Sequence, residues 1–339
     1  MSPEEMGAGI AVVAIVLYAA FGGADFGGGI WTLLARGPRR DDQRNALERA
    51  IGPVWETNHV WLILLVVTLF VVFPTAYSAI FTALYVPLFI ALVGIVARGA
   101  AFALRHYGER DTALNQGALR AFSIASLLTP FTFGLAVGAV TGGHIDVVDG
   151  EVRSGAFAAW LSPFALVCGV IGLLVCAFVG AAYMIPRTEG DLRTDFRRRA
   201  IIASVALGAA TTVAIPIAHF DAEEFAGRLD RVEVIFAMVA TAVFGLATLV
   251  VLWRGYSRIV PPLAAATVAG VISAWAFALN PHMILPGLTI QAAAAPSITV
   301  KSFLISLPIG ALILVPSLLL LYLTFSREVF VAGDAPPGH

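Results

Sequence analysis

The hydrophobic residues of this chain gather into long apolar runs that are separated by short polar segments. A helix needs about 20 mainly apolar residues to cross the roughly 30 Å hydrocarbon core of a bilayer, so the sequence predicts about nine transmembrane helices. They lie near residues 7–34, 56–73, 77–104, 119–140, 157–185, 201–218, 234–253, 259–279 and 303–325. The alternating pattern of a membrane barrel is not found. The predicted fold class is therefore an all-α polytopic membrane protein, with a single transmembrane domain over residues 1–339.

The composition agrees with a membrane protein. Hydrophobic residues make up 59% of the chain and charged residues only 13%, against about 25% charged residues in soluble domains. The surrounding expected for so apolar a chain is lipid. The net charge of −1 provides no basic field that would attract nucleic acid, so we expect no nucleic-acid partner. Cys168 and Cys176 lie in one apolar run, more than two helical turns apart, which is too far for a disulfide. We expect both to be free packing residues.

The basic residues are distributed unevenly between the predicted loops. Of the 21 Lys and Arg residues, 17 fall in the odd-numbered loops, at the adjoining ends of spans or in the C-terminal tail. Cytoplasmic loops of membrane proteins carry an excess of such residues. The sequence therefore predicts the N-terminus outside and the C-terminus in the cytoplasm, as an odd number of spans requires.

Few ionisable residues fall inside the predicted spans, and charge in lipid is costly enough that each is a candidate for a structural or functional role. Asp25 lies in the first span, Glu56 opens the second, and Arg98 lies toward the cytoplasmic end of the third. His59 follows Glu56 by three residues and shares its helical face. Two interpretations stay open. These residues can form a proton path, or Arg98 can form an ion pair with one of the acids that only fixes helix packing.

The sequence contains little that could hold a cofactor. His59 and His282 are the only histidines near or within predicted spans, and a lone histidine in an apolar run is more often a satisfied polar residue than a haem ligand. Nucleotide-binding and metal-ligand motifs are missing, so we expect no cofactor and no metal on this chain. The spans would also suit a secondary transporter or a structural membrane partner, although the two related halves typical of transporters are not seen.

Three motifs resemble one known family. The stretch 52–63, GPVWETNHVWLI, is similar to the G-P-x-W-D-G-N-x-V-W-L signature of subunit II of cytochrome bd-type quinol oxidases. Residues 24–27, ADFG, are similar to the family's G-F-D-F-G, and residues 98–105, RGAAFALR, to its R-G-x-A-F-E-F-R. The order of the motifs, the chain length and the number of helices also match. The resemblance covers the whole chain, while its specific motifs lie in the first third.

The resemblance implies a function in the aerobic respiratory chain. The oxidase complex couples quinol oxidation to the reduction of oxygen to water, and its haems, b-type and in the usual case d-type, sit in the partner subunit I. This chain would be the haem-free subunit II, inactive alone, which supplies scaffold together with proton and oxygen access. The resemblance also implies a structural quinone, a small single-helix third subunit, and a bacterial or archaeal cytoplasmic membrane.

The resemblance assigns roles to residues of this chain only at positions where its motifs match those of the family. The motif acid, near which the family's proton path runs, corresponds to Glu56. The second Trp of the motif, linked to oxygen access, corresponds to Trp61. The candidates for the proton path are Glu56, Asp25 and His59. A structural polar cluster would comprise Arg98 and Asn58.

The chain departs from the family pattern at four positions. Glu56 replaces the Asp of the motif, and Thr57 replaces the Gly that follows. The positions of two further family acids hold Gly22 and Ala103. Two carboxylates near the usual proton route are therefore missing, which implies a divergent branch of the family whose partner can carry a different haem set.

Overall fold

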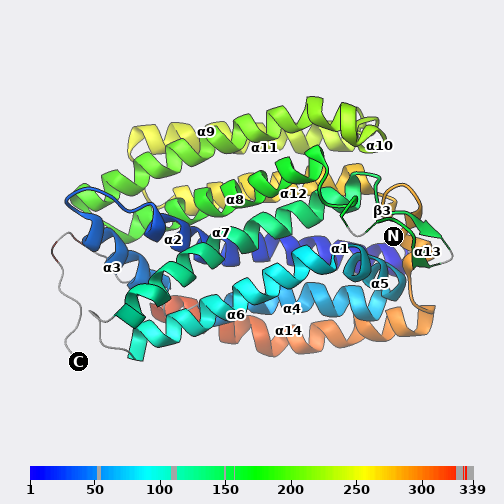
Figure 1. Cartoon of the computed structure of the whole chain (residues 1–339), viewed down its shortest axis with the longest axis horizontal. Helices are drawn as coiled ribbons and strands as arrows, with labels where there is room; N and C mark the ends of the chain where they lie inside the picture. The colour runs from blue at the N-terminus through cyan, green and yellow to red at the C-terminus, as the bar shows by residue number, and fades with distance from the viewer. Residues whose placement is uncertain are drawn as a thin grey trace.

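The computed structural model describes residues 1–51, 55–107, 113–148, 150–155, 157–325, 331 and 333. Long helices run side by side along the longest axis of the molecule (Figure 1). Eight of the described helices are long and apolar enough to cross a membrane, and a bent pair, Asn58–Val72 with Pro74–Ala83, makes a ninth candidate span. The prediction of an all-α multi-span membrane protein is therefore confirmed.

The first span consists of two α-helices joined by a π-helical turn. α1 (Pro3–Leu17) begins with a capping box, in which the side chains of Ser2 and Glu5 each accept a hydrogen bond from the other residue's amide (3.2 and 2.8 Å). The π-helical turn η1 (Tyr18–Gly22) leads directly into α2 (Gly23–Leu33). Such turns occur mostly inside α-helices and often at functional sites, and this one directly precedes the segment that carries Asp25.

A short helix, α3 (Arg40–Ile51), lies where we predicted a loop. It buries Ala46 and Leu47 in the main core cluster, while Arg40 and Asp41 stay exposed. A search for apolar runs of about 20 residues cannot detect such a helix, because only one of its faces is apolar.

The predicted third span, 77–104, is wrong at its start, because it joins parts of two helices. α4 (Trp55–Val72) ends before Phe73, and α5 (Pro74–Ala83) continues at an angle of 117° to it. A proline disfavours helical backbone in the residue before it, so Pro74 ends α4 at this point. The actual span is α6 (Tyr85–Tyr107). The prediction included residues 77–83 because they are apolar, although the chain bends there.

Other helices differ from the prediction at their ends. α8 (Pro163–Met184) begins six residues later than predicted, because the Ser162 hydroxyl accepts a hydrogen bond from the Ala165 amide (3.2 Å) and so caps the helix. α9 (Gly190–Asp221) and α14 (Ser297–Phe325) are longer than predicted, since their polar first turns are helical too. The remaining elements are α7 (Ala113–Thr141), β1 (Val147–Val148), β2 (Glu151–Val152), η2 (Ile185–Arg187), α10 (Glu223–Ala226), α11 (Val232–Arg254), α12 (Val260–Leu279), β3 (His282–Ile284), β4 (Leu288–Thr289) and α13 (Ile290–Ala293).

The two ends of the bundle carry different short elements (Figure 1). α3 lies at one end, while α5, α10, β3 and α13 lie at the other, near the N-terminus. The β1–β2 and β3–β4 pairs are short antiparallel hairpins and add no layer to the bundle.

The core of the bundle forms where α2, α7 and α8 approach each other closely. A Cβ atom on Gly27 would lie 2.1 Å from the carbonyl oxygen of Cys176, and one on Gly134 would lie 2.3 Å from that of Cys168. Only glycine allows helix backbones to come this close. The Gly27 contact holds α2, and with it Asp25, against α8, while the Gly134 contact holds α7 against α8.

Candidate functional site

A buried polar cluster lies where α2, α4 and α6 meet. Asp25 on α2 is 2% exposed and Arg98 on α6 is 1% exposed. The Oδ2 atom of Asp25 accepts a hydrogen bond from Nδ2 of Asn58 (2.9 Å) and lies 3.7 Å from Nη2 of Arg98. The structure thus brings together three of the residues singled out from the sequence, as a buried ion pair with an amide beside it.

The Arg98 guanidinium is poorly supplied with hydrogen-bond acceptors. It lies over the rings of Phe26 (4.6 Å to the ring centre) and Phe122 (5.2 Å). None of its three nitrogen atoms donates a hydrogen bond to the part of the chain that the structure describes. A buried charge without acceptors is costly. Within the described residues, the two rings and the carboxylate of Asp25 supply its favourable interactions.

Of the other two proton-path candidates, Glu56 and His59, the structure describes the side chain of His59 only. The side chain of Glu56 lies outside the described residues, so the face that it was predicted to share with His59 stays a prediction. His59 lies beside Tyr18, with the Tyr18 hydroxyl oxygen 3.4 Å from Nδ1 of His59. Sequence reasoning missed Tyr18, because the π-helical turn and the packing of α1 on α4 bring the two rings together, and no motif marks that contact.

Trp61, the candidate for oxygen access, lies in apolar surroundings. Its ring stacks on that of Phe21, with ring centres 6.4 Å apart and an angle of 23° between the planes. Its indole nitrogen is buried and has no hydrogen-bond partner among the described residues. An apolar position suits a small apolar molecule, but the role itself stays a prediction.

A large apolar cavity of about 760 Å³ reaches this region from between α8, α9, α11 and α12. Tyr18 and Phe26 form part of its wall and so separate it from the polar cluster. Trp275 also lines it, and the indole nitrogen of Trp275 has no hydrogen-bond partner among the described residues. Cys168 and Cys176 face the same cavity as free thiols. The sequence carries no signal for the cavity, because it is formed by small and apolar side chains of several helices.

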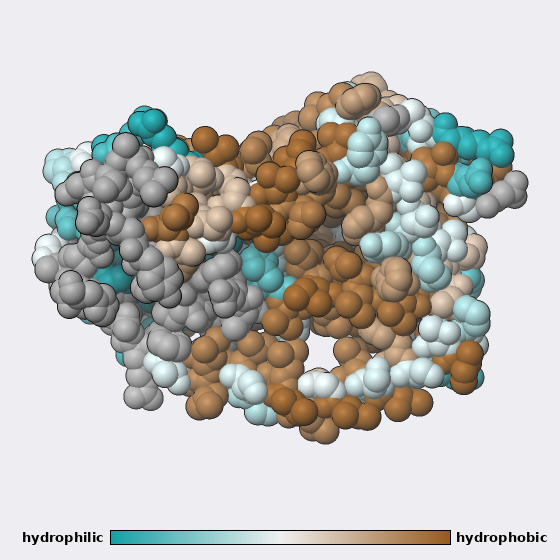
Figure 2. All heavy atoms as spheres, turned by 60° about the horizontal axis from the view of Figure 1, so that its bottom comes forward, coloured by the Kyte–Doolittle hydropathy of each residue, from teal (hydrophilic) through white to brown (hydrophobic). Residues whose placement is uncertain are grey.

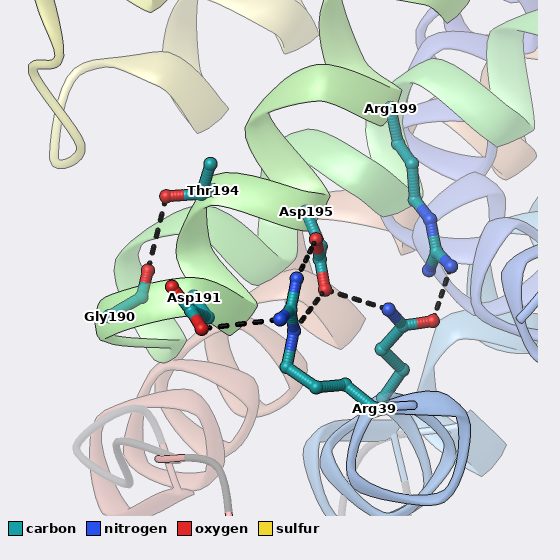
Figure 3. A network of polar contacts seen from close by, with 7 residues as sticks. Arg39, Gly190, Asp191, Thr194, Asp195 and Arg199 are labelled. Atoms are coloured by element: carbon teal, nitrogen blue, oxygen red, sulfur yellow. Dashed lines mark hydrogen bonds and ion pairs between the residues drawn. The ribbon is translucent and has the colours of Figure 1, made fainter. Parts of the chain in front are cut away.

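A second polar network joins α3 and the residue before it, Arg39, to the first turns of α9 (Figure 3). Arg39 donates hydrogen bonds to both carboxylate oxygens of Asp195 (2.8 and 3.0 Å) and to Asp191 (3.2 Å). Gln43 donates to Asp195 (2.8 Å) and accepts from Arg199 (2.5 Å). The hydrogen bonds to Asp195 and its charge raise the pKa of the Arg39 guanidinium. In the sequence Arg39 serves only as an orientation signal, because its acidic partners Asp191 and Asp195 lie more than 150 residues away.

His282, the other histidine near a span, is engaged in a polar contact outside the spans. Nη1 of Arg228 lies 3.0 Å from Nδ1 of His282, and since a guanidinium can only donate, Nδ1 accepts. Burial and the charge of Arg228 lower the pKa of His282, which agrees with a neutral imidazole. Within the described part of the chain, no group of three or more His, Cys, Asp or Glu residues could hold a metal ion.

The sequence profile of the family described as "Cytochrome bd terminal oxidase subunit II" matches residues 4–325. The chain is 31% identical over 196 residues to cytochrome bd-I ubiquinol oxidase subunit 2 of Escherichia coli (strain K12), which covers 57% of this chain and 51% of that protein. It thus spans about half the length of that relative. It is also 22% identical over 326 residues, 93% of each chain, to a putative cytochrome bd menaquinol oxidase subunit II of Bacillus subtilis (strain 168).

The fold is similar to that of a solved chain from the bd oxidase of Geobacillus thermodenitrificans. The TM-score is 0.80, with 97% of this chain and 100% of that chain covered at 21% identity. At this identity the likeness concerns the fold alone. The family profile, in contrast, covers nearly all of the sequence, including the segments that hold Asp25, Asn58 and Arg98. The chain belongs to the cytochrome bd terminal oxidase subunit II family.

Proposed function

We propose that this chain is the haem-free subunit II of a bd-type terminal quinol oxidase, which couples quinol oxidation to the reduction of oxygen to water. The family match over residues 4–325 carries the proposal and favours it over a transporter. The haems belong to a partner subunit I, and the complex sits in a bacterial cytoplasmic membrane, as the bacterial relatives suggest. The N-terminus faces outward, in accord with the arginine distribution. Labelling of a cysteine introduced at Ser2 from outside intact cells tests this orientation.

Co-expression with the partner subunit tests the proposal. We expect a tag on this chain to retain a subunit with b-type haem, and the purified complex to consume oxygen when quinol is supplied. This chain purified alone should consume none. A small third subunit would be retained as an additional low-mass chain. If the tagged chain retains no haem protein and no quinol-dependent oxygen uptake, the proposal is wrong.

We assign the docking of subunit I to the face formed by α4, α6 and α14. α14 is strongly apolar, yet only 6% of its most apolar 18-residue stretch is buried by the rest of this chain. The side of the molecule on which it lies is largely hydrophobic and hollowed (Figure 2). The exposed apolar side chains of this face include Ile63, Val67, Phe70, Phe89, Val93, Val96, Ile305, Ile309 and Leu312. α4 also carries Asn58 and His59, so a subunit docked here lies next to the polar cluster. Crosslinks from α14 that reach only lipid or a second copy of this chain would reject the assignment.

We further propose that Glu56, Asp25 and His59 carry protons and that Trp61 lines an oxygen route. The support is the buried position of Asp25 beside Arg98 and Asn58, and the apolar surroundings of Trp61. Ionisable side chains buried in membranes commonly mark proton relays.

The Glu56→Gln variant should lower quinol-driven oxygen uptake by at least about tenfold, because a positioned acid or base typically contributes more than that to the rate of proton transfer. The membrane potential should therefore build up more slowly. Both are measured on the complex in liposomes. Glu151→Gln, at an exposed position in β2, is the control and should leave both unchanged. Unchanged turnover and potential in the Glu56 variant would show that this residue is not on the proton path.

The apolar cavity is our proposed site for a structural quinone. The residues fit such a molecule, because the walls are apolar and the unpartnered indole N–H of Trp275 can donate to a quinone oxygen. A bound quinone would supply a redox-active ring with two carbonyl acceptors. The proposal is rejected if organic extraction of the purified complex yields no quinone.

A further inference from the structure

A row of buried hydroxyl groups runs along α7 and has no role in the function proposed above. It comprises Ser123, Ser126, Thr129 and Thr132, none of which is more than 5% exposed. Residues three apart on a helix are neighbours on its surface, so the hydroxyls follow one another along the helix. α7 packs against both α6 and α2, the helices that carry Arg98 and Asp25.

Two glycine contacts place the middle of this row at the level of the buried ion pair. A Cβ atom on Gly29, one turn after Asp25 on α2, would lie 2.0 Å from the Ser126 hydroxyl oxygen. The second contact is on α6, where a Cβ atom on Gly94 would lie 2.2 Å from Oγ1 of Thr129.

Arg98 follows Gly94 by one turn of α6 and reaches across to α7, where its guanidinium lies over the Phe122 ring. It also lies over Phe26 on α2. The side chain therefore points into the space where α2, α6 and α7 meet, the same space that Thr129 borders.

Several polar groups in this space have no partner among the described residues. They include all three nitrogen atoms of Arg98 and the hydroxyl of Thr129, which is fully buried. Ser126 and Thr132, in contrast, donate to the carbonyls of Phe122 and Thr129 (2.7 and 2.9 Å). Pro130 lies inside α7 and lacks an amide hydrogen, so the carbonyl of Ser126 loses its helical donor. Arg98 and Thr129 thus lack partners among the described residues, and the Ser126 carbonyl lacks its helical donor, although buried polar groups are nearly always paired.

We propose that bound water fills this place and joins Arg98, Thr129 and the Ser126 carbonyl to Asp25. A buried water commonly makes about three hydrogen bonds to groups that would otherwise be unsatisfied, and this site offers both donors and acceptors. The water extends the proton path from Asp25 onto the hydroxyl row of α7. Each water accepts a proton on one side and releases another on its far side, so no group is oxidised and no net charge remains. The proton role rests on the proposed function, whereas the hydration site does not.

The test uses the purified complex with its partner and compares two valine variants. Thr129→Val keeps the shape of the side chain and removes the unpartnered hydroxyl. Thr248→Val, on α11, is the matched control, because Thr248 is also fully buried but its hydroxyl donates to the Phe244 carbonyl (2.7 Å). A high-resolution cryo-EM map should show water within hydrogen-bond distance of Arg98 in the unmodified protein.

In Thr129→Val, oxygen uptake should slow by roughly three- to tenfold, the factor expected for one lost hydrogen bond, with a larger solvent isotope effect and an altered pH profile. Thr248→Val should change none of these. A map in which Arg98 donates only to the Glu56 carboxylate, without water, overturns the hydration site. Equal kinetics in the two variants overturn the proton role. A complex without haem would instead refute the proposed function, and the map would still decide the hydration site.

Discussion

The Gly27→Ala variant should fail to form a stable folded subunit. The added Cβ atom would lie 2.1 Å from the carbonyl oxygen of Cys176 and 2.8 Å from the Cα of Gly180. Both are backbone atoms of α8, so neither can move aside unless the two helices separate. Overpacking against side chains already costs about 1–3 kcal/mol, and a clash with backbone leaves fewer ways to relax. We therefore expect a loss of more than about 3 kcal/mol in the free energy of unfolding.

Size-exclusion chromatography and thermal unfolding of the detergent-solubilised complex measure this effect. Gly9→Ala in α1 is the matched control, because among the described residues no atom outside its own stretch of the helix lies within 4 Å of the position that its Cβ would take. It should fold normally and gain slightly from the better helix propensity of alanine. Equal melting temperatures for the two variants would mean that α2 and α8 are not in such close contact, and that this contact does not hold Asp25 in place.

Replacing Asp25 alone should destabilise the protein more than replacing the whole ion pair. Asp25→Asn would leave the buried Arg98 guanidinium without a counter-charge, and breaking one partner of a buried pair costs about 3–5 kcal/mol. The double variant Asp25→Leu/Arg98→Met removes both charges and should recover most of the lost stability, because apolar replacements of buried pairs are often neutral. Both variants should lose proton-coupled turnover, since Asp25 is a proposed proton carrier.

A double-mutant cycle built from Asp25→Leu, Arg98→Met and the double variant, followed by thermal unfolding of the complex, measures the coupling of this pair. Arg39→Gln provides the comparison for a partly exposed ion pair, since the Arg39 and Asp195 side chains are 38% and 21% exposed. It should lower the melting temperature less than Asp25→Asn does, because solvent screens such a pair and can hydrate the charge left behind. If Asp25→Asn proved as mild as Arg39→Gln, Asp25 would carry no charge in the folded protein, and its assignment as the partner of Arg98 would be wrong.

The part of the candidate site that could be predicted from the sequence is its charged residues, because they lie inside apolar runs. Asp25 and Arg98 stand out because a charge inside a predicted span is rare. Their contact was one of the alternatives left open, and the structure realises it, with Asn58 as a further neighbour. Tyr18 and Thr129 could not be found in this way, because a tyrosine or threonine in an apolar run is common.

By itself, the sequence determined the membrane class, most of the spans and the residues whose charge needs a partner, because hydropathy and charge are properties of contiguous stretches. The tertiary structure decided which of these residues meet. The bend before Pro74, the π-helical turn at Tyr18–Gly22 and the close approach at Gly27 set the direction and rotation of each helix. Contacts between helices depend on those rotations, so the Arg39–Asp195 network, the apolar cavity and the hydroxyl row beside Arg98 emerge only when the helices are packed.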